Sequence, residues 1–291
     1  MPELLLLLIT VLWGTTFSLI KSALATTSPA ALLVVRFAVA TAAMWIVTVA
    51  SRTRSWPYAR ALFRDGIVLG LLLAAGFVLQ TEGLARTTPA RSAFFTGLTV
   101  LLVPFLGAAI YRRRIAGRAA AAAILATLGL GLLTHPAART PLVATLGGDL
   151  LSLGCALAFG LHILWTSEWS ARHPLLPLTL VEIATAFVAM AGYGLTQPFR
   201  FVSTPALWAT ILFLGVGMTA AAFLLQNWCQ RRVTPVRAAL IFSLEPVVAA
   251  AFAWFHRGDR LTRLELVGGI CVIAGVLLGE VGAAWAKRRS S

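Results

Sequence analysis

The chain has 291 residues, of which 59% are hydrophobic and only 12% are charged. About a quarter of the residues in a soluble globular domain are charged, so this composition excludes an ordinary soluble domain. The net charge of +14 would suit a nucleic-acid partner, but nearly all basic residues lie in short segments between apolar runs. The basic charge therefore indicates membrane topology and not nucleic-acid binding.

Apolar runs of about 20 residues recur along the chain, each long enough to cross a hydrocarbon core of about 30 Å. The first run follows Glu3, has no basic segment before it and is too long for the core of a signal peptide, so we expect a retained helix. The fifth run is short and rich in Ala and Gly. We predict an all-helical protein with ten spans at about 3–23, 30–50, 66–85, 90–111, 118–134, 147–167, 176–195, 206–227, 236–256 and 265–285.

The basic residues of the connecting segments are distributed unevenly. With the N-terminus inside, 15 Arg and Lys residues lie on the cytoplasmic side and 7 on the other side. Positive charge is retained on the cytoplasmic side of a membrane. We therefore expect a multi-pass protein of a bacterial-type inner (plasma) membrane, with both termini in the cytoplasm.

The two halves of the chain repeat each other at a shift of 146 positions. Residues 74–93 align with residues 220–239 without a gap, and ten of these 20 positions are identical. Each half holds five spans, an odd number, so the second half enters the bilayer from the opposite side. We predict two inverted five-helix repeats, residues 1–145 and 146–291, around a central cavity. This arrangement is typical of secondary transporters that work by alternating access.

Motifs of enzymes and metal sites are missing from the sequence. Cys155, Cys229 and Cys271 lie in or beside apolar runs without close spacing, which favours small core residues over a disulfide or a metal site. Signatures of serine hydrolases, zinc proteases and phosphate-binding loops do not occur. We expect no enzymatic activity, no cofactor and no metal; a polytopic membrane enzyme is the less favoured alternative.

The strongest repeated segment contains a Thr-Pro pair followed by an arginine. The threonine suits a helix N-cap and the proline the first helical position. An arginine in the first turn of a helix is disfavoured by the helix dipole, so another interaction must compensate for it. We predict that the two turns are gates on opposite faces; tight turns with arginines at lipid headgroups are an equally weighted alternative. The gating candidates are Arg86, Thr88, Pro89 and Arg91, and Arg232, Thr234, Pro235 and Arg237.

Polar and aromatic side chains inside the spans are candidates for contact with a small-molecule substrate. Gln80 and Gln226 occupy equivalent positions, and an amide in hydrocarbon needs a partner, either a ligand or another helix. Glu245 precedes Pro246, so an acid lies beside a carbonyl freed by proline; a simple kink is the alternative. The predicted path residues are Trp13, Phe17, Gln80, Phe94, Phe95, Thr99, Trp165, Gln226, Asn227, Ser243 and Glu245.

Other ionisable side chains also lie well inside the spans. Arg36 and Glu182 are equivalent under the shift, and we expect an ion pair between them because each is costly in lipid when unpaired. His162 and Trp165 are three residues apart and are predicted to share a helix face. Lys21 lies near the end of the first span, where it can reach the interface or an anionic group.

These motifs resemble the drug/metabolite transporter superfamily in its ten-helix EamA type. Trp13-Gly14, Leu244-Glu245-Pro246 and the Gly-Asp-Arg-Leu sequence at 258–261 carry the resemblance. The first half departs from the pattern, with Thr99-Val100 in place of Glu-Pro and Arg-Arg-Arg-Ile at 112–115.

The resemblance implies an exporter whose first, third, fourth, sixth, eighth and ninth helices surround the path. Amino-acid exporters of the YddG type are the most similar members, which implies amino acids, including aromatic ones, as substrates; efflux of drugs or other lipophilic compounds is the alternative. A monomer in the lipid bilayer is expected. Small multidrug pumps of the superfamily use an acid central in their first helix. This chain has none there, so coupling to protons by that device is not expected.

Overall fold

The computed structural model describes residues 1–291 except 52–59, 113, 135–141, 258–261 and 290–291. It also leaves out the side chains of residues 89–90, 142–145, 253–257 and 280–289. The Gly-Asp-Arg-Leu motif at 258–261 therefore lies outside the described residues. Secondary structure in the described part is helical apart from one isolated bridge between Thr27 and Phe201.

The helices follow the predicted spans in order. Three spans are interrupted, namely α4–α5, α9–η2–α10 and α11–α12, and with each counted once the described helices form ten spans. Eight spans, all except α6 and α13, are long and apolar enough to cross a membrane by the length and composition of their described residues; α6 has 17 residues. The elements are α1 (Pro2–Ala23), α2 (Pro29–Ala50), α3 (Arg60–Arg86), α4 (Pro89–Gly97), α5 (Thr99–Tyr111), α6 (Gly117–Leu133), α7 (Leu142–Trp169), η1 (Ser170–Arg172), α8 (Leu175–Gly194), α9 (Pro205–Leu212), η2 (Phe213–Ala221), α10 (Ala222–Gln230), α11 (Pro235–Phe242), α12 (Glu245–Arg257) and α13 (Arg263–Arg289).

The two repeated turns start α4 and α11 as the Thr-Pro pairs predict. Pro89 and Pro235 occupy the first helical positions. Thr88 is an N-cap whose hydroxyl accepts a hydrogen bond from the backbone N–H of Arg91 at 3.3 Å. Thr234 is likewise the N-cap of α11 and has the extended backbone of that position, but its hydroxyl makes no capping bond.

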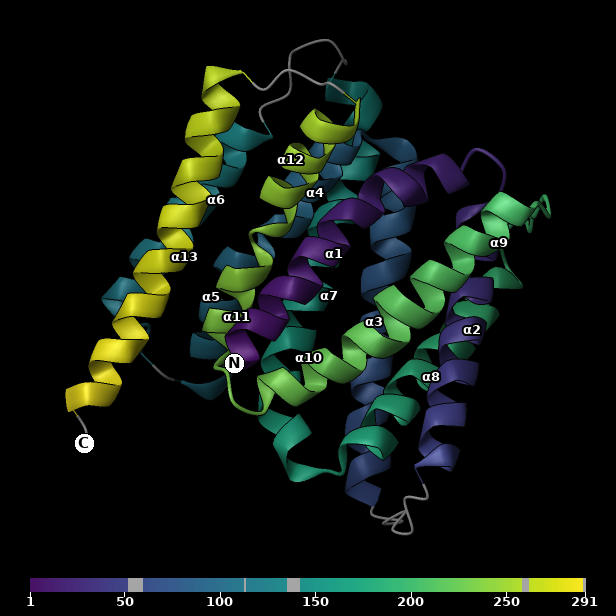
Figure 1. Ribbon diagram of the computed structural model, residues 1–291, viewed down its shortest axis with the longest axis horizontal. Coiled ribbons are helices and arrows are strands. Elements are labelled where there is room, and N and C mark those ends of the chain that lie inside the picture. Colours follow the sequence, from purple (N-terminus) through teal and green to yellow (C-terminus); the bar gives the residue numbers. More distant parts are fainter. Residues whose placement is uncertain (52–59, 113, 135–141, 258–261, 290–291) are drawn as a thin grey trace.

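Helices α2 and α8 are equivalent in the two halves and pack on each other, as expected for halves related by a pseudo-two-fold axis. These helices lie together at one edge of the bundle (Figure 1). Their contacting side chains belong to one buried cluster and correspond to each other under the 146-residue shift. The pairs are Phe37 with Ile183, Ala40 with Ala186, and Met44 with Met190.

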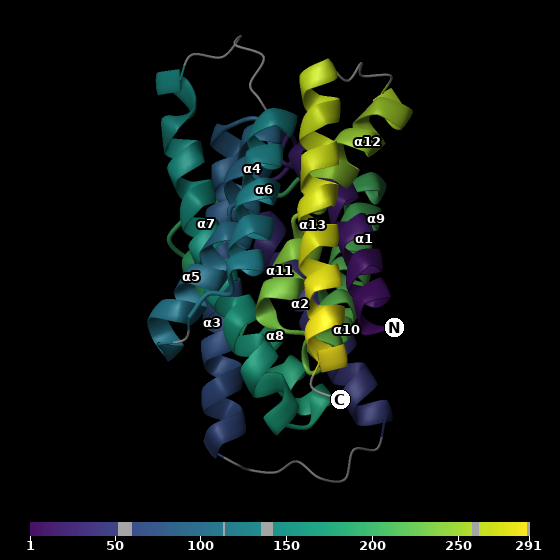
Figure 2. The ribbon, with the colours of Figure 1, turned by 90° about the vertical axis from the view of Figure 1, so that its left-hand side faces the viewer.

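Close approach through glycines joins α6 to α13 at the opposite edge of the bundle (Figures 1 and 2). A Cβ on Gly129 would lie 2.6 Å from the backbone nitrogen of Val272. At the equivalent position in α13, a Cβ on Gly275 would lie 2.9 Å from the carbonyl oxygen of Ala122. Small residues allow such backbone contact in lipid, where no hydrophobic effect holds helices together.

Replacement of Gly129 by alanine tests this packing. Gly129→Ala is expected to destabilise the protein by about 1–3 kcal/mol, because the new methyl group meets backbone atoms that cannot move aside. The matched control is Gly192→Ala in α8, where a Cβ would meet nothing within 4 Å. Thermal unfolding in detergent measures both. An unchanged melting temperature for Gly129→Ala would show that α6 and α13 are not held by this contact.

Candidate functional site

Two helices break at equivalent positions in the middle of the bundle. The first break lies at Leu98, between α4 and α5, and the second at Ser243 and Leu244, between α11 and α12. At each break a hydroxyl donates to the carbonyl oxygen three residues earlier: Thr99 to Thr96 and Ser243 to Leu240, both at 2.7 Å. Such bonds compete with the helical ladder and bend helices. Irregular backbone at membrane depth is tolerated where it lines a cavity or is buried in protein.

A cavity lies beside both breaks, with about 810 Å³ of empty space, solvent-open parts included. Its lining comes from α1, α3, α4, α5, α7, α10, α11 and α12, which make up the six spans that the resemblance implies, together with Arg36 of α2. Aromatic rings and polar groups alternate around it. The polar lining residues are Thr16, Arg36, Gln80, Thr96, Thr99, His162, Gln226, Ser243 and Glu245.

Seven of the eleven predicted path residues line this cavity, and four do not. The seven are Trp13, Phe17, Gln80, Thr99, Gln226, Ser243 and Glu245. Phe94 packs toward α6, and the ring of Phe95 lies against it with 5.1 Å between ring centroids. Trp165 stacks on Trp169 and does not share the cavity face of His162. Asn227 is fully buried behind the lining.

Aromatic rings in mutual contact form one wall of the cavity. Trp13 lies 5.4 Å from Phe223 and 5.5 Å from Phe242 between ring centroids, and its indole N–H donates to the carbonyl oxygen of Met218 at 3.0 Å. Phe77 meets Phe223 at 6.0 Å. Tilted and edge contacts of this kind are favourable beyond the area that they bury. The wall is therefore rigid and apolar.

Arg36 is 2% exposed, and its Nε donates to the hydroxyl of Thr219 at 2.8 Å. Its guanidinium carbon lies 4.6 Å from the ring centroid of Phe77, a cation–π contact. Thr219 lies in η2, a π-helical segment, and its hydroxyl in turn donates to Leu214 five residues earlier. The Nη atoms of Arg36 have no hydrogen-bond partner among the described residues. Part of this buried cation is thus available to a ligand.

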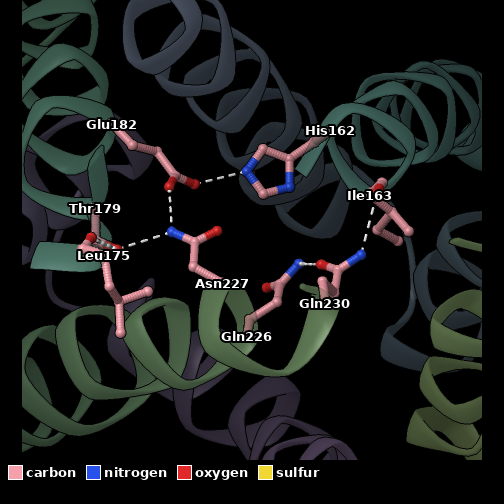
Figure 3. Close-up of polar contacts among 8 residues, drawn as sticks. All are labelled: His162, Ile163, Leu175, Thr179, Glu182, Gln226, Asn227 and Gln230. Atoms are coloured by element: carbon pink, nitrogen blue, oxygen red, sulfur yellow. Dashed lines mark hydrogen bonds and ion pairs between the residues drawn. The ribbon is translucent and has the colours of Figure 1, made fainter. Parts of the chain in front are cut away.

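The expected ion pair between Arg36 and Glu182 does not form. Glu182 instead lies 2.7 Å from His162 Nε2 through one oxygen, and its other oxygen accepts from Asn227 Nδ2 at 2.7 Å (Figure 3). Each side chain instead finds its partners on other helices, Arg36 on η2 and Glu182 on α7 and α10. Glu245, the other acid in the cavity, makes no hydrogen bond or ion pair among the described residues.

Both predicted gate turns are tied to the other half of the chain by an ion pair. Nε of Arg91 lies 3.1 Å from each carboxylate oxygen of Asp149 in α7, which also accepts from the hydroxyl of Thr87. Arg237 lies 3.1 Å from Glu3 in α1. Glu3 and Asp149 are themselves 146 residues apart. The two bridges are therefore reciprocal, as a two-fold relation requires.

Among the described residues, the other two candidate gating arginines do not connect helices. Arg86 pairs with Glu82 on its own helix, one turn away. Arg232 lies over the ring of Trp228 at 4.4 Å. The acids Glu3 and Asp149 were not among the predicted gate residues. Their spacing, equal to that of Arg91 and Arg237, is the signal that would have identified them.

A bundle of apolar helices broken at equivalent positions around a central cavity defines a multi-pass membrane protein of the secondary-transporter class. The chain belongs to the EamA-like transporter family, whose model matches residues 1–135 and again residues 146–279. This is a family of transporters and not of enzymes.

Relatives of the chain cover it almost completely at low identity. An uncharacterized transporter of Archaeoglobus fulgidus is 28% identical over 94% of this chain and 83% of its own length. A probable amino-acid metabolite efflux pump of Escherichia coli is 27% identical over 97% of this chain and 96% of its own. A solved crystal structure superposes with a TM-score of 0.78 over 99% of both chains at 18% identity, a likeness that concerns the fold alone.

Proposed function

We propose that the chain exports small amphipathic metabolites, namely amino acids including aromatic ones, across a bacterial-type inner membrane. The halves 1–145 and 146–291 would rock against each other, so that the central cavity opens to one side at a time. Relatives from Escherichia coli and Salmonella typhimurium that are described as probable amino-acid metabolite efflux pumps support the substrate class. The orientation with both termini in the cytoplasm follows from the distribution of positive charge.

The observation that carries this proposal is the pair of opposite charges in the cavity. Arg36 offers Nη donors without a partner among the described residues, and Glu245 offers a carboxylate without one. A zwitterion satisfies both groups, with its carboxylate toward Arg36 and its ammonium toward Glu245. Arginine is the residue best suited to hold a carboxylate through paired hydrogen bonds.

The aromatic wall supports a substrate with an apolar side chain. Phe223 contacts both Trp13 and Phe77 in the lining, and these three rings leave little for a polar side chain to bond. Ligand sites are mostly apolar, with a few polar groups that fix orientation. An aromatic or large aliphatic side chain against this wall, with the zwitterion at Arg36 and Glu245, uses both parts of the cavity.

Substitution of the two charges tests substrate recognition. In proteoliposome counterflow, the wild type is expected to prefer phenylalanine over both phenethylamine and phenylpropionate. Arg36→Gln should remove the preference over the amine and Glu245→Gln the preference over the acid. Each should lose about 10- to 100-fold in affinity for phenylalanine, because a hydrogen bond to a charged group contributes about 1.5–3 kcal/mol.

Arg172→Gln and Glu168→Gln are the matched controls. They remove one charge of each sign from an ion pair within the exposed end of α7 and η1, away from the cavity. Both should transport as the wild type does. If lipophilic cations undergo counterflow and no amino acid does, drug efflux is the function and amino-acid export is wrong. If no amino acid undergoes counterflow, the proposed substrate class is refuted.

The reciprocal ion pairs support a gating role for the two repeated turns. Arg91–Asp149 and Arg237–Glu3 each join one half of the chain to the other, so rocking of the halves must stretch one pair while the other stays closed. The two pairs differ in burial: Arg91 and Asp149 are 12% and 4% exposed, Arg237 and Glu3 23% and 32%. We infer that the bridge at α4 holds its end of the cavity more firmly.

Cysteine labelling tests the gates. Thr96→Cys, in a background with Cys155, Cys229 and Cys271 replaced by alanine, places a thiol in the cavity. Asp149→Asn is expected to raise its labelling by an impermeant maleimide from the external face about tenfold or more, because loss of one partner of a buried pair costs about 3–5 kcal/mol. Glu3→Gln should raise labelling from the cytoplasmic face about fivefold or less, because exposed pairs contribute about 0–1 kcal/mol.

Arg86→Gln is the control for this experiment, since the ion pair of Arg86 lies within α3 at the same end as Asp149. It should leave labelling unchanged from both faces. Equal increases from one and the same face for Asp149→Asn and Glu3→Gln would rule out gates on opposite sides.

A further inference from the structure

Three polar side chains from three helices form a network that begins at the cavity lining and extends behind it. His162 of α7 and Glu182 of α8 are 1% and 0% exposed, with 2.7 Å between Nε2 and Oε1. Asn227 of α10 donates through Nδ2 to the second carboxylate oxygen at 2.7 Å and to Thr179 Oγ1 at 2.9 Å. Figure 3 shows Glu182 between the imidazole and the amide, so both of its oxygens are engaged.

The hydrogen bonds fix where a proton can be held. The hydroxyl of Thr179 donates to the carbonyl oxygen of Leu175 at 3.0 Å, so its oxygen must accept from Asn227. The amide of Asn227 is thereby oriented with its NH₂ toward Glu182, and Oε2 of Glu182 is an acceptor. A proton shared by the pair therefore lies between Oε1 of Glu182 and Nε2 of His162.

The charge of the pair depends on a second proton. With a proton only in the hydrogen bond between Nε2 and Oε1, the pair carries one negative charge at a fully buried position, which is costly. A second proton, on Nδ1 of His162, makes the pair neutral. Imidazole ordinarily changes its charge between roughly pH 5 and 8. His162 also lines the cavity, and its Nδ1 has no hydrogen-bond partner among the described residues. The buried pair thus has a face on the substrate path.

The other titratable groups on the neighbouring elements either share the cavity with His162, have a basic partner of their own, or are buried thiols. Arg36 of α2 and Glu245 of α12 share the cavity with His162. Toward the helix ends the carboxylates of α3 and α7 each have a basic partner, and the thiols of α7 and α10 are buried. These groups are Asp65 with His173 and Arg64, Glu82 with Arg86, Asp149 with Arg91, Glu168 with Arg172, and the thiols Cys155 and Cys229.

We propose that the His162–Glu182 pair is a proton-binding site and that one proton enters the cell through it for each substrate molecule exported. The proposal rests on the proposed export function. The proton binds from the external side to the empty cavity and leaves to the cytoplasm when substrate binds. The substrate ammonium and the protonated imidazole repel each other across the cavity, so the site holds one or the other. Export of a zwitterion then moves one positive charge inward per cycle.

Two transport assays on the whole chain in proteoliposomes separate coupling from transport. Counterflow of phenylalanine without a gradient reports movement of substrate alone, and accumulation driven by a pH gradient reports coupling. In Glu182→Gln, counterflow is expected to persist while gradient-driven accumulation falls about tenfold or more. His173→Gln is the matched control. It removes a second histidine that lies 2.8 Å from a buried carboxylate, Asp65, but outside the cavity lining, and it should leave both assays unchanged.

A measurement without substrate tests the site even if phenylalanine is not transported. Titration of purified protein in weak buffer between about pH 5 and 8 should show one proton more bound by the wild type than by Glu182→Gln. Gradient-driven accumulation by Glu182→Gln at the wild-type level would overturn the proposal, as would a wild type indifferent to the gradient or equal proton binding by the two proteins. Absence of counterflow for every amino acid in the wild type would instead overturn the export function, and with it the coupling.

Discussion

Inside hydrocarbon, each backbone N–H and C=O must find its partner within the chain, and this constraint accounts for most of the structure. It makes the spans helical and leaves little freedom in how they begin and end. The exceptions are informative. The breaks at Leu98 and at Ser243–Leu244 occur beside the central cavity, with hydroxyls of Thr99 and Ser243 taking over carbonyl groups nearby. The irregular backbone therefore lies beside the cavity, where backbone polar groups can also bond a polar ligand.

The two halves share the packing of their helices but differ in the side chains that they place around the cavity. Packing between α2 and α8 and between α6 and α13 repeats under the shift, and so do the two ion pairs at the repeated Thr-Pro turns. The cavity, by contrast, is asymmetric. A two-fold cavity would bind a symmetric ligand, whereas distinct groups on its two sides suit a molecule with two different ends. Equivalent positions that differ are Thr16 and His162, Arg36 and Glu182, and Thr99 and Glu245.

Much of the fold was predictable because it rests on long, repeated signals. Run length gave the spans, and the duplication gave the two related halves of the bundle. Thr88 and Pro89 gave the start of α4, because capping is a local property of adjacent residues. The shift also paired Arg91 with Arg237 correctly. The same 146-residue shift relates Glu3 to Asp149, but these two acids were not predicted as partners of the arginines.

Contacts between spans were less predictable, because a repeat reveals equivalence and not proximity. Arg36 and Glu182 are equivalent but find other partners. The partner of Arg36 depends on a π-helical segment that has no counterpart among the described residues of the first half. Phe94 was predicted on the path because it is an aromatic residue of the fourth span, and residue type does not reveal which neighbour a side chain faces. His162 was recognised as polar and intramembrane, but its pairing with Glu182 requires the relative rotation of α7 and α8.

The glycine-packed pair α6 and α13 contributes no described side chain to the cavity lining. One pair of helices therefore holds that edge of the bundle together, and other helices line the cavity that a substrate would contact. A descendant of this chain could exchange its cargo by altering the walls of the cavity while that scaffold stays as it is. Modularity of this kind gives a small, duplicated fold room to diversify without first becoming unstable.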